Sequence, residues 1–188
     1  MQQIETIRIE TPRLVLRRMR SSDLTDSLEH RSDPQVCRYA HLPQTQQQVA
    51  KRIQDAMQAW QGKDGEKLFL AIELTLEQKL IGELMFKYQQ ADSGVGEIGF
   101  HLNRHYQGQG YAFEAVSALI HYLFEQLKLQ KITAICVTDN LASQVLMEKL
   151  GMQKEALLRS HYKIGDKRFD MFSYAMLAAE VDNTRLSK

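Results

Sequence analysis

The chain has 188 residues, of which 44% are hydrophobic and 25% charged, and its 24 Lys and Arg residues against 23 Asp and Glu residues leave a formal net charge of +1. These values are typical of a globular protein, and the length suits one domain spanning residues 1–188. The balanced charge gives no basis for bulk attraction to nucleic acid or to an acidic membrane surface, so neither is expected as a partner.

The cysteine content and the N-terminal sequence indicate the cellular compartment in which the protein is expected. Cys37 and Cys136 are the only cysteines and form no C-x-x-C pair, so the sequence predicts neither a metal or redox motif nor a disulfide framework. Residues 1–10 lack the apolar segment of a secretory signal, and no apolar run approaches the roughly 20 residues that cross a bilayer. A cytoplasmic location is therefore expected.

The first hundred residues alternate between strand and helix patterns. In chain order they predict a strand at 7–17, broken near Thr11-Pro12, helices starting near 21 and 34, a helix from Thr45 to Gly62, and strands at 68–74, 80–88 and 97–102. Thr45 is a typical N-cap residue, and apolar residues follow it at three- and four-residue steps. The strands at 68–74 and 80–88 are separated by a short polar turn, which favours a hairpin.

The second half begins with a change of period. Beyond Gly110 the apolar residues step by three and four through Leu127, which predicts a long helix with a buried face. A strand at 131–137, a helix at 141–150 capped by Asp139 or Asn140, and strands at 155–161 and 168–177 complete the chain. Strands and helices thus mix around one sheet, which predicts an α/β or α+β fold.

The segment most informative about chemistry joins the strand at 97–102 to the long helix through a loop, 107–112, that holds two glycines. Glycine allows close approach of the backbone to a ligand, and a helix start offers unpaired N–H groups, so the segment predicts a phosphate or pyrophosphate site. It matches neither nucleotide-binding fingerprint: no Gly-Lys-Ser/Thr follows, and Phe113 stands where a Rossmann loop needs glycine or alanine. A plain turn between strand and helix stays the alternative.

The loop also resembles a known family. Gln107-x-x-Gly110-x-Ala112 is similar to the loop with which GNAT superfamily N-acetyltransferases bind the pyrophosphate of coenzyme A. Further segments resemble the RimJ/RimL-like branch, the ribosomal-protein N-terminal acetyltransferases: Thr11-Pro12-Arg13-Leu14, Asn140-Leu141-Ala142-Ser143, Glu148-Lys149-Leu150-Gly151-Met152, Gly165-x-x-x-x-Asp170 and Tyr174. The resemblance covers nearly the whole chain in order, although Val181 follows Glu180 where that branch often has tryptophan.

The resemblance implies a single-domain GNAT fold, with a mixed, mostly antiparallel sheet that splays between two parallel strands. Acetyl-CoA would be the co-substrate in the opening, its pantetheine arm pairing with the backbone at Phe100 and Leu102, and no metal is implied. Asn140 would contact the pantetheine arm or the acetyl carbonyl, besides capping its helix. The pyrophosphate would lie on the backbone N–H groups of Gln107, Gly108, Gln109, Gly110, Tyr111 and Ala112.

The reaction that the resemblance implies is direct attack of a primary amine on the thioester in a ternary complex. Glu97 is the candidate base, through water, and Ser143 the candidate proton or hydrogen-bond donor to the leaving sulfur. Alternation along a strand would equally produce an ion-paired or solvated Glu97, and Ser143 would equally suit an exposed helix face. His101 lies on the same strand and is a second candidate for moving the proton, as is water alone.

The acceptor is less well specified. In this fold the acceptor pocket would be formed largely by segments 31–48 and 159–169, which carry more basic than acidic residues and so disfavour polycationic aminoglycosides. A protein N-terminal amine is therefore the first expectation, and a small-molecule amine (a polyamine, amino compound or antibiotic) is the alternative. A non-catalytic acyl-CoA-binding module also stays open. Many relatives are homodimers, which makes a homodimer an expectation from resemblance.

Overall fold

The computed structural model describes residues 7–181, and its centre is an eight-stranded sheet with the order β1-β2-β3-β4-β5-β6-β8-β7. The strands are β1 (Arg8–Glu10), β2 (Leu14–Arg18), β3 (Leu68–Leu74), β4 (Lys79–Gln90), β5 (Val95–Leu102), β6 (Lys131–Val137), β7 (Gln153–Ile164) and β8 (Lys167–Leu177). The helices are α1 (Leu24–Arg31), α2 (Pro34–Cys37), α3 (Gln46–Ala56), α4 (Tyr111–Glu125) and α5 (Leu141–Lys149). Within the described range, no helix combines the length and apolarity needed to span a membrane.

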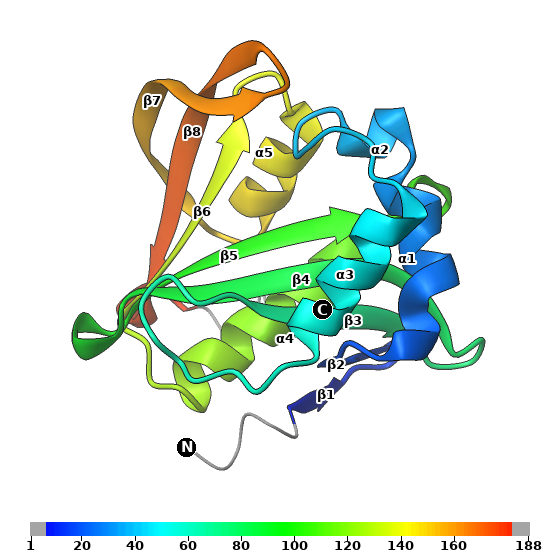
Figure 1. Ribbon diagram of the computed structural model, residues 1–188. Coiled ribbons are helices and arrows are strands. Elements are labelled where there is room, and N and C mark those ends of the chain that lie inside the picture. The colour runs from blue at the N-terminus through cyan, green and yellow to red at the C-terminus, as the bar shows by residue number, and fades with distance from the viewer. Residues whose placement is uncertain (1–6, 182–188) are drawn as a thin grey trace.

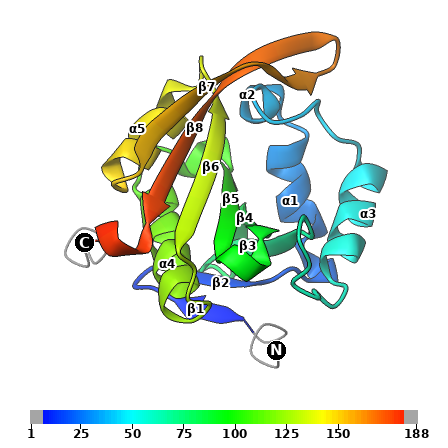
Figure 2. The same ribbon diagram turned by 90° about the vertical axis from the view of Figure 1, so that its left-hand side faces the viewer.

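The sheet is antiparallel except between β5 and β6, which run parallel. Helices α4 and α5 cover one face, and α1 and α3 cover the other (Figures 1 and 2). β5 and β6 pair over only three residues each, up to Glu97 opposite Thr133. Beyond that point the two strands diverge and the sheet opens into a V (Figure 1). The predicted fold, a mixed sheet splayed between two parallel strands, is thereby confirmed.

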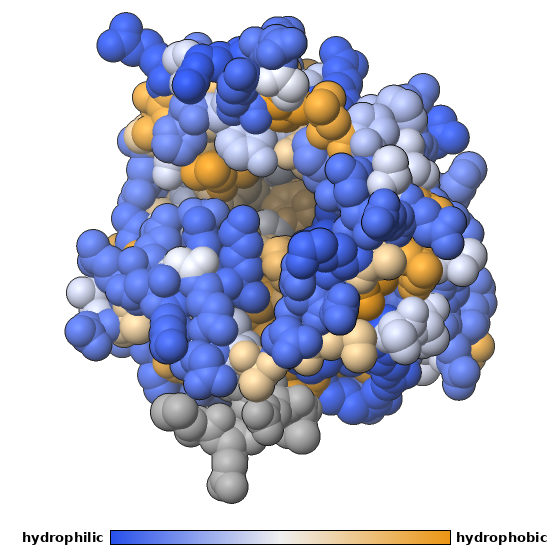
Figure 3. Space-filling model, in the orientation of Figure 1, coloured by the Kyte–Doolittle hydropathy of each residue, from blue (hydrophilic) through white to orange (hydrophobic). Residues whose placement is uncertain are grey.

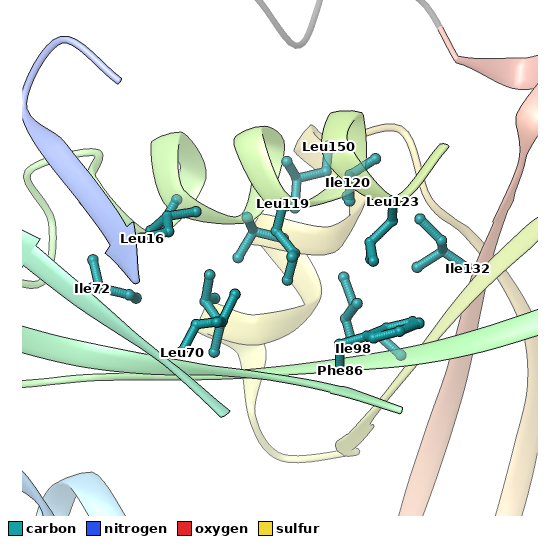
Figure 4. Close-up of a cluster of buried hydrophobic side chains, with 14 of the residues drawn as sticks. Leu16, Leu70, Ile72, Phe86, Ile98, Leu119, Ile120, Leu123, Ile132 and Leu150 are labelled. Carbon is teal, nitrogen blue, oxygen red and sulfur yellow. The ribbon is translucent and has the colours of Figure 1, made fainter. Parts of the chain in front are cut away.

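The main core lies between the sheet and α4 (Figure 4). Residues at three- and four-residue steps of α4, Leu119, Ile120 and Leu123, are fully buried against Phe86 of β4 and Ile98 of β5. Each such side chain contributes about 1.5–3 kcal/mol on burial. Because β5 carries Ile98 inward on this face, the alternating residues of the strand must face the opposite side of the sheet, toward α1 and α3.

The prediction of a helix from Thr45 to Gly62 is wrong at its C-terminal end, because α3 stops at Ala56. The N-cap is confirmed, since the Thr45 hydroxyl accepts a hydrogen bond from the Gln48 N–H. The periodic residue Trp60 stacks instead on Tyr88, with ring centroids 5.7 Å apart. Tertiary packing of the indole ring thus takes precedence over the helical period.

The β7–β8 hairpin bends over the opening toward α2 (Figure 2). Its register shifts between Leu158 and Tyr162, and Ser160 in that bulge has φ +52°. The Asp170 carboxylate accepts a hydrogen bond from the Ser160 N–H at 2.6 Å, which holds the bulge. The bent hairpin then reaches the segment after α2, where the Tyr162 hydroxyl donates to the Ala40 carbonyl at 3.0 Å.

Candidate active site

The candidate site begins at the unpaired edge of β5. From Ile98 to Leu102 this strand pairs with β4 on one side only, because β6 has turned away. Figure 3 shows a hollow with an apolar floor in this region, between the β6–β8 part of the sheet and the helices α1–α3. The backbone groups of a strand edge need hydrogen-bond partners, so this edge can pair with an extended ligand.

The glycine loop ends directly at α4, which begins at Tyr111. Gly110 is the N-cap residue with φ +83°, and Gly108 has φ +75°, both in the left-handed region that favours glycine. The first-turn N–H groups of α4 have no acceptor within the helix, and the positive end of the helix dipole lies there. A backbone of this form can approach an anion closely, and the pyrophosphate site at residues 107–112 stays a prediction.

Two residues of the N-terminal segment hold this loop. Arg13 donates to the Gln109 carbonyl at 3.1 Å and to the Glu114 carboxylate at 2.6 Å, and the Thr11 hydroxyl donates to the same carboxylate at 2.6 Å. The Arg13 guanidinium also lies 4.3 Å from the ring centroid of Tyr111. Sequence reasoning treated Thr11 and Arg13 only as part of a family pattern, and no local signal links them to a helix about a hundred residues away.

Glu97 lies at the base of the V, on the face of the sheet that α1 and α3 cover. Its side chain is 11% exposed, and its carboxylate contacts Lys87 Nζ at 3.1 Å and accepts a hydrogen bond from Gln89 Nε2 at 2.9 Å. It is therefore ion-paired rather than solvated. Lys87 and Gln89 were missed by sequence reasoning, because their contact with Glu97 depends on the register of β4 against β5.

Asn140 and Ser143 lie on the other side of the opening, at the start of α5 (Figure 1). The Asn140 side chain accepts a hydrogen bond from the Ser143 N–H at 3.3 Å, which confirms the helix cap. Ser143 is 8% exposed, so it does not lie on an exposed helix face. Its side chain hydrogen-bonds to Cys136 of β6, whose pKa is raised to about 11 by burial, which leaves a neutral thiol at neutral pH.

A buried charge cluster joins α1 and α3 to the sheet. The Glu83 carboxylate accepts hydrogen bonds from Ser27 at 2.7 Å, from Arg31 at 2.8 and 2.6 Å, and from Arg52 at 2.5 Å. Burial by itself would raise the pKa of Glu83, but the neighbouring His30 and the charges of Arg31 and Arg52 hold it well below its usual value. Glu83 is therefore ionised at neutral pH, and the cluster carries one more positive than negative charge.

His101 lies beside this cluster, with its ring centroid 5.1 Å from that of His30 and 5.4 Å from that of His41. Both His101 ring nitrogens are buried and have no hydrogen-bond partner among the described residues. Burial, then the nearby His30 and Arg31, lower the pKa of His101 to about 3. A neutral imidazole of such low basicity is a poor proton acceptor, which favours Glu97 over His101 as the base.

Cys37, His41 and His101 bring three potential metal-ligand atoms within 4.8 Å of one another. The His41 Nε2 lone pair is, however, engaged by Arg31 Nη1 at 3.0 Å. Burial raises the pKa of Cys37 to about 11, so the thiol is protonated. The guanidinium charges of Arg31 and Arg52 beside these atoms also disfavour a cation, so this cluster does not have the character of a metal centre.

The known proteins that resemble this chain are acetyltransferases. The family model described as acetyltransferase (GNAT) domain matches residues 13–153. The chain is 31% identical over 172 residues to the uncharacterized N-acetyltransferase YnaD of Bacillus subtilis (strain 168), covering 92% of this chain and 98% of that protein. The chain belongs to the acetyltransferase (GNAT) family. The predicted class, N-acetyltransferase, is thereby confirmed.

Other relatives agree at the level of the family. A crystal structure of a GNAT-family acetyltransferase from Bacillus anthracis superposes with a TM-score of 0.83 and 30% identity, covering 93% of this chain and all of that one. The ribosomal-protein-serine acetyltransferase of Escherichia coli (strain K12) is 26% identical over 143 residues, which cover 76% of this GNAT chain and 78% of that protein. At this identity the RimJ/RimL-like branch stays a prediction.

Proposed function

We propose that this protein transfers the acetyl group of acetyl-CoA to a primary amine by direct attack in a ternary complex. The observation that carries the proposal is the coincidence, at one opening of the sheet, of an anion-binding helix start with an unpaired strand edge. Acetyl-CoA has both of the chemical parts that such a site requires: a diphosphate and, some distance along the molecule, amide groups that can pair with a strand.

In this proposal, different residues bind different parts of the coenzyme. The N–H groups of residues 107–112 bind the pyrophosphate, with Gly110 permitting its close approach. The backbone at Phe100 and Leu102 pairs with the pantetheine arm as an added strand. Asn140, on the facing wall, contacts the arm or the acetyl carbonyl.

The chemistry follows from this placement. The neutral amine attacks the thioester carbonyl, and a backbone N–H of the unpaired β5 edge near Phe100 stabilises the oxyanion. Glu97 takes a proton from the amine through a water molecule. The C–S bond then breaks as the carbonyl re-forms, and Ser143 donates a hydrogen bond to the departing thiolate, which leaves as coenzyme A after protonation.

A protein N-terminal amine is the proposed acceptor, and it would place this chain with the RimJ/RimL-like enzymes. Support comes from the contact between Tyr162 and the Ala40 carbonyl, which closes the hairpin over the opening. A site enclosed in this way admits an extended chain end more readily than a side chain on a folded surface. A small-molecule amine is the alternative, since it also passes such an entrance.

The test is a two-stage assay. Calorimetry of the purified protein with coenzyme A comes first, and thiol release from acetyl-CoA is then followed with N-terminal peptides, polyamines and aminoglycosides in parallel. Release with peptides that have a free N-terminus, and none with N-acetylated controls, supports the proposal. Binding of coenzyme A without turnover of any amine would instead indicate a non-catalytic acyl-CoA-binding module.

Replacing Gly110 by valine is expected to weaken coenzyme A binding at least about tenfold, because a β-branched residue at φ +83° costs roughly 1–3 kcal/mol or reshapes the loop. A Cβ at this position would also lie 3.4 Å from Arg13 Nη2. Isothermal calorimetry measures the change. Gly62→Val is the matched control, since Gly62 has φ +70° and an added Cβ there would make only ordinary contacts, the shortest 3.5 Å from Trp60. Unchanged coenzyme A affinity in Gly110→Val would contradict the assigned loop.

A further inference from the structure

A cavity of about 600 Å³ lies on the sheet beside Glu97, on the face away from α4. Gly65 of the segment between α3 and β3 contributes to its rim, because the Gly65 N–H donates to the Tyr88 carbonyl and brings that segment over the end of β4. Its lining comprises Gly65, Lys87, Tyr88, Gln89, Gln90, Val95, Lys131 and Thr133. A space of this size is typical of small-ligand sites.

The charged side chains that line this cavity are lysines, and each is ion-paired with a carboxylate beside the cavity. The residues of its lining that are charged at neutral pH are two lysines, Lys87 and Lys131, while their ion-pair partners, Glu97 and Glu155, lie outside the lining. The lysine side chains are only 24% and 29% exposed, so solvent screens them in part. An ammonium group has three donors. Lys87 contacts one oxygen of Glu97, and Lys131 donates to both oxygens of Glu155 at 2.8 Å, so each lysine keeps at least one donor for an anionic ligand.

The cavity borders the proposed reaction centre, because two of its lining residues contact Glu97. Lys87 and Gln89 line the cavity and both contact the Glu97 carboxylate. Thr133 extends this chain of contacts to β6 by donating to Gln89 Oε1 at 3.2 Å. Thr133 is paired with Glu97, and Lys131 lies two residues before it on β6, which corresponds to about 7 Å along the strand.

Resting on the proposed function, we infer that this cavity is a further acceptor subsite, beside Glu97 and in addition to segments 31–48 and 159–169, and that it selects amines carrying a carboxylate or phosphate about 7 Å from the nucleophilic nitrogen. The amine lies at Glu97, and the anionic group lies at Lys131, with Lys87 between them. Two sources have this chemistry: a peptide whose second residue is acidic, and a small ω-amino acid. Polycationic amines are disfavoured at the same site.

The experiment uses matched acceptors and one lysine variant. Peptides beginning Ser-Asp and Ser-Asn form one arm, and 5-aminopentanoate with its amide forms the other, so the two sources are separated. The wild-type protein is expected to favour the acidic member of at least one pair about tenfold in kcat/KM, the size of one charge-assisted hydrogen bond. Lys131→Gln should reduce this preference to about twofold or less, with coenzyme A affinity unchanged.

Lys51→Gln is the control, because Lys51 is exposed on α3 and has no place in the cavity. Equal rates for acidic and neutral acceptors in the wild type, or a preference that survives Lys131→Gln, would overturn the subsite. If no acceptor is acetylated, the proposed function fails. The subsite is then tested by calorimetry, which compares the binding of the acidic and the neutral ligand to the protein loaded with coenzyme A. Tighter binding of the acidic ligand that is lost in Lys131→Gln would support it, and equal binding would reject it.

Discussion

Replacing Glu97 by glutamine is expected to lower kcat/KM for acetyl transfer about a hundredfold to ten-thousandfold, the usual contribution of a general base. Glutamine preserves the shape of the side chain and can still accept the hydrogen bond from Gln89, so the β5 backbone should keep its position. It cannot accept a proton from the amine. Steady-state kinetics with the best acceptor, at a fixed pH near neutrality, measures the loss.

The pH profile separates a base from a structural carboxylate. If Glu97 removes the proton, the deficit of Glu97→Gln should shrink as the pH approaches the pKa of the acceptor amine, because the amine then arrives already neutral. A structural defect would not be rescued in this way. Glu125→Gln is the matched control, since Glu125 is half exposed at the end of α4. A loss of less than about threefold in folded Glu97→Gln would rule out the base role.

Replacing Glu83 by alanine is expected to reduce the free energy of unfolding by about 3–5 kcal/mol, because it leaves two guanidinium groups without their buried counter-charge. Arg31 and Arg52 both contact this carboxylate, and the Glu83 side chain is 2% exposed, so water does not replace it. Denaturant unfolding measures the change. In Glu10→Ala, where the carboxylate is 67% exposed, the loss should stay below about 1 kcal/mol.

The stability difference between wild type and Glu83→Ala should depend on pH. Because the folded-state pKa of Glu83 lies below its unfolded value, the stabilisation from Glu83 is complete above about pH 5 and is lost as pH falls through the folded-state pKa. The stability difference between wild type and Glu83→Ala should therefore shrink below about pH 4, near the unfolded pKa of glutamate. A difference that stays constant from pH 7 to pH 3 would show that lost packing, and not lost charge, causes the destabilisation.

The resulting picture of the site has two halves with different requirements. The proposed coenzyme half consists of backbone groups, so its specificity would come from the shape of the glycine loop and the β5 edge. The proposed acceptor half includes side chains of β4, β5 and β6, among them Lys87 and Glu97, so its specificity would come from charge. Relatives that keep the loop while changing these strand residues would accordingly share the coenzyme and differ in the acceptor.

Local sequence was sufficient for the helices and strands, apart from the C-terminal end of α3. Hydrophobic period predicted the long helix after Gly110 and the strand that carries Glu97, and the cap residues Thr45 and Asn140 predicted two helix starts. These features depend on residues a few positions apart, whose preferences a sequence displays directly. The proposed anion site likewise rests on one strand, one loop and one helix start.

The contacts that complete the site were decided only by tertiary structure. The Arg13–Glu114 pair joins residues 101 positions apart, and the Arg31–Glu83 pair joins residues 52 positions apart. Neither the hydrophobic period nor the composition of the sequence can predict such pairs, because strand order and register determine the distance between the two residues. Lys87 likewise reaches Glu97 only because β4 pairs with β5 in one register. Trp60 fits the helical period of the sequence, but in the fold it lies beyond the end of α3 and stacks on Tyr88.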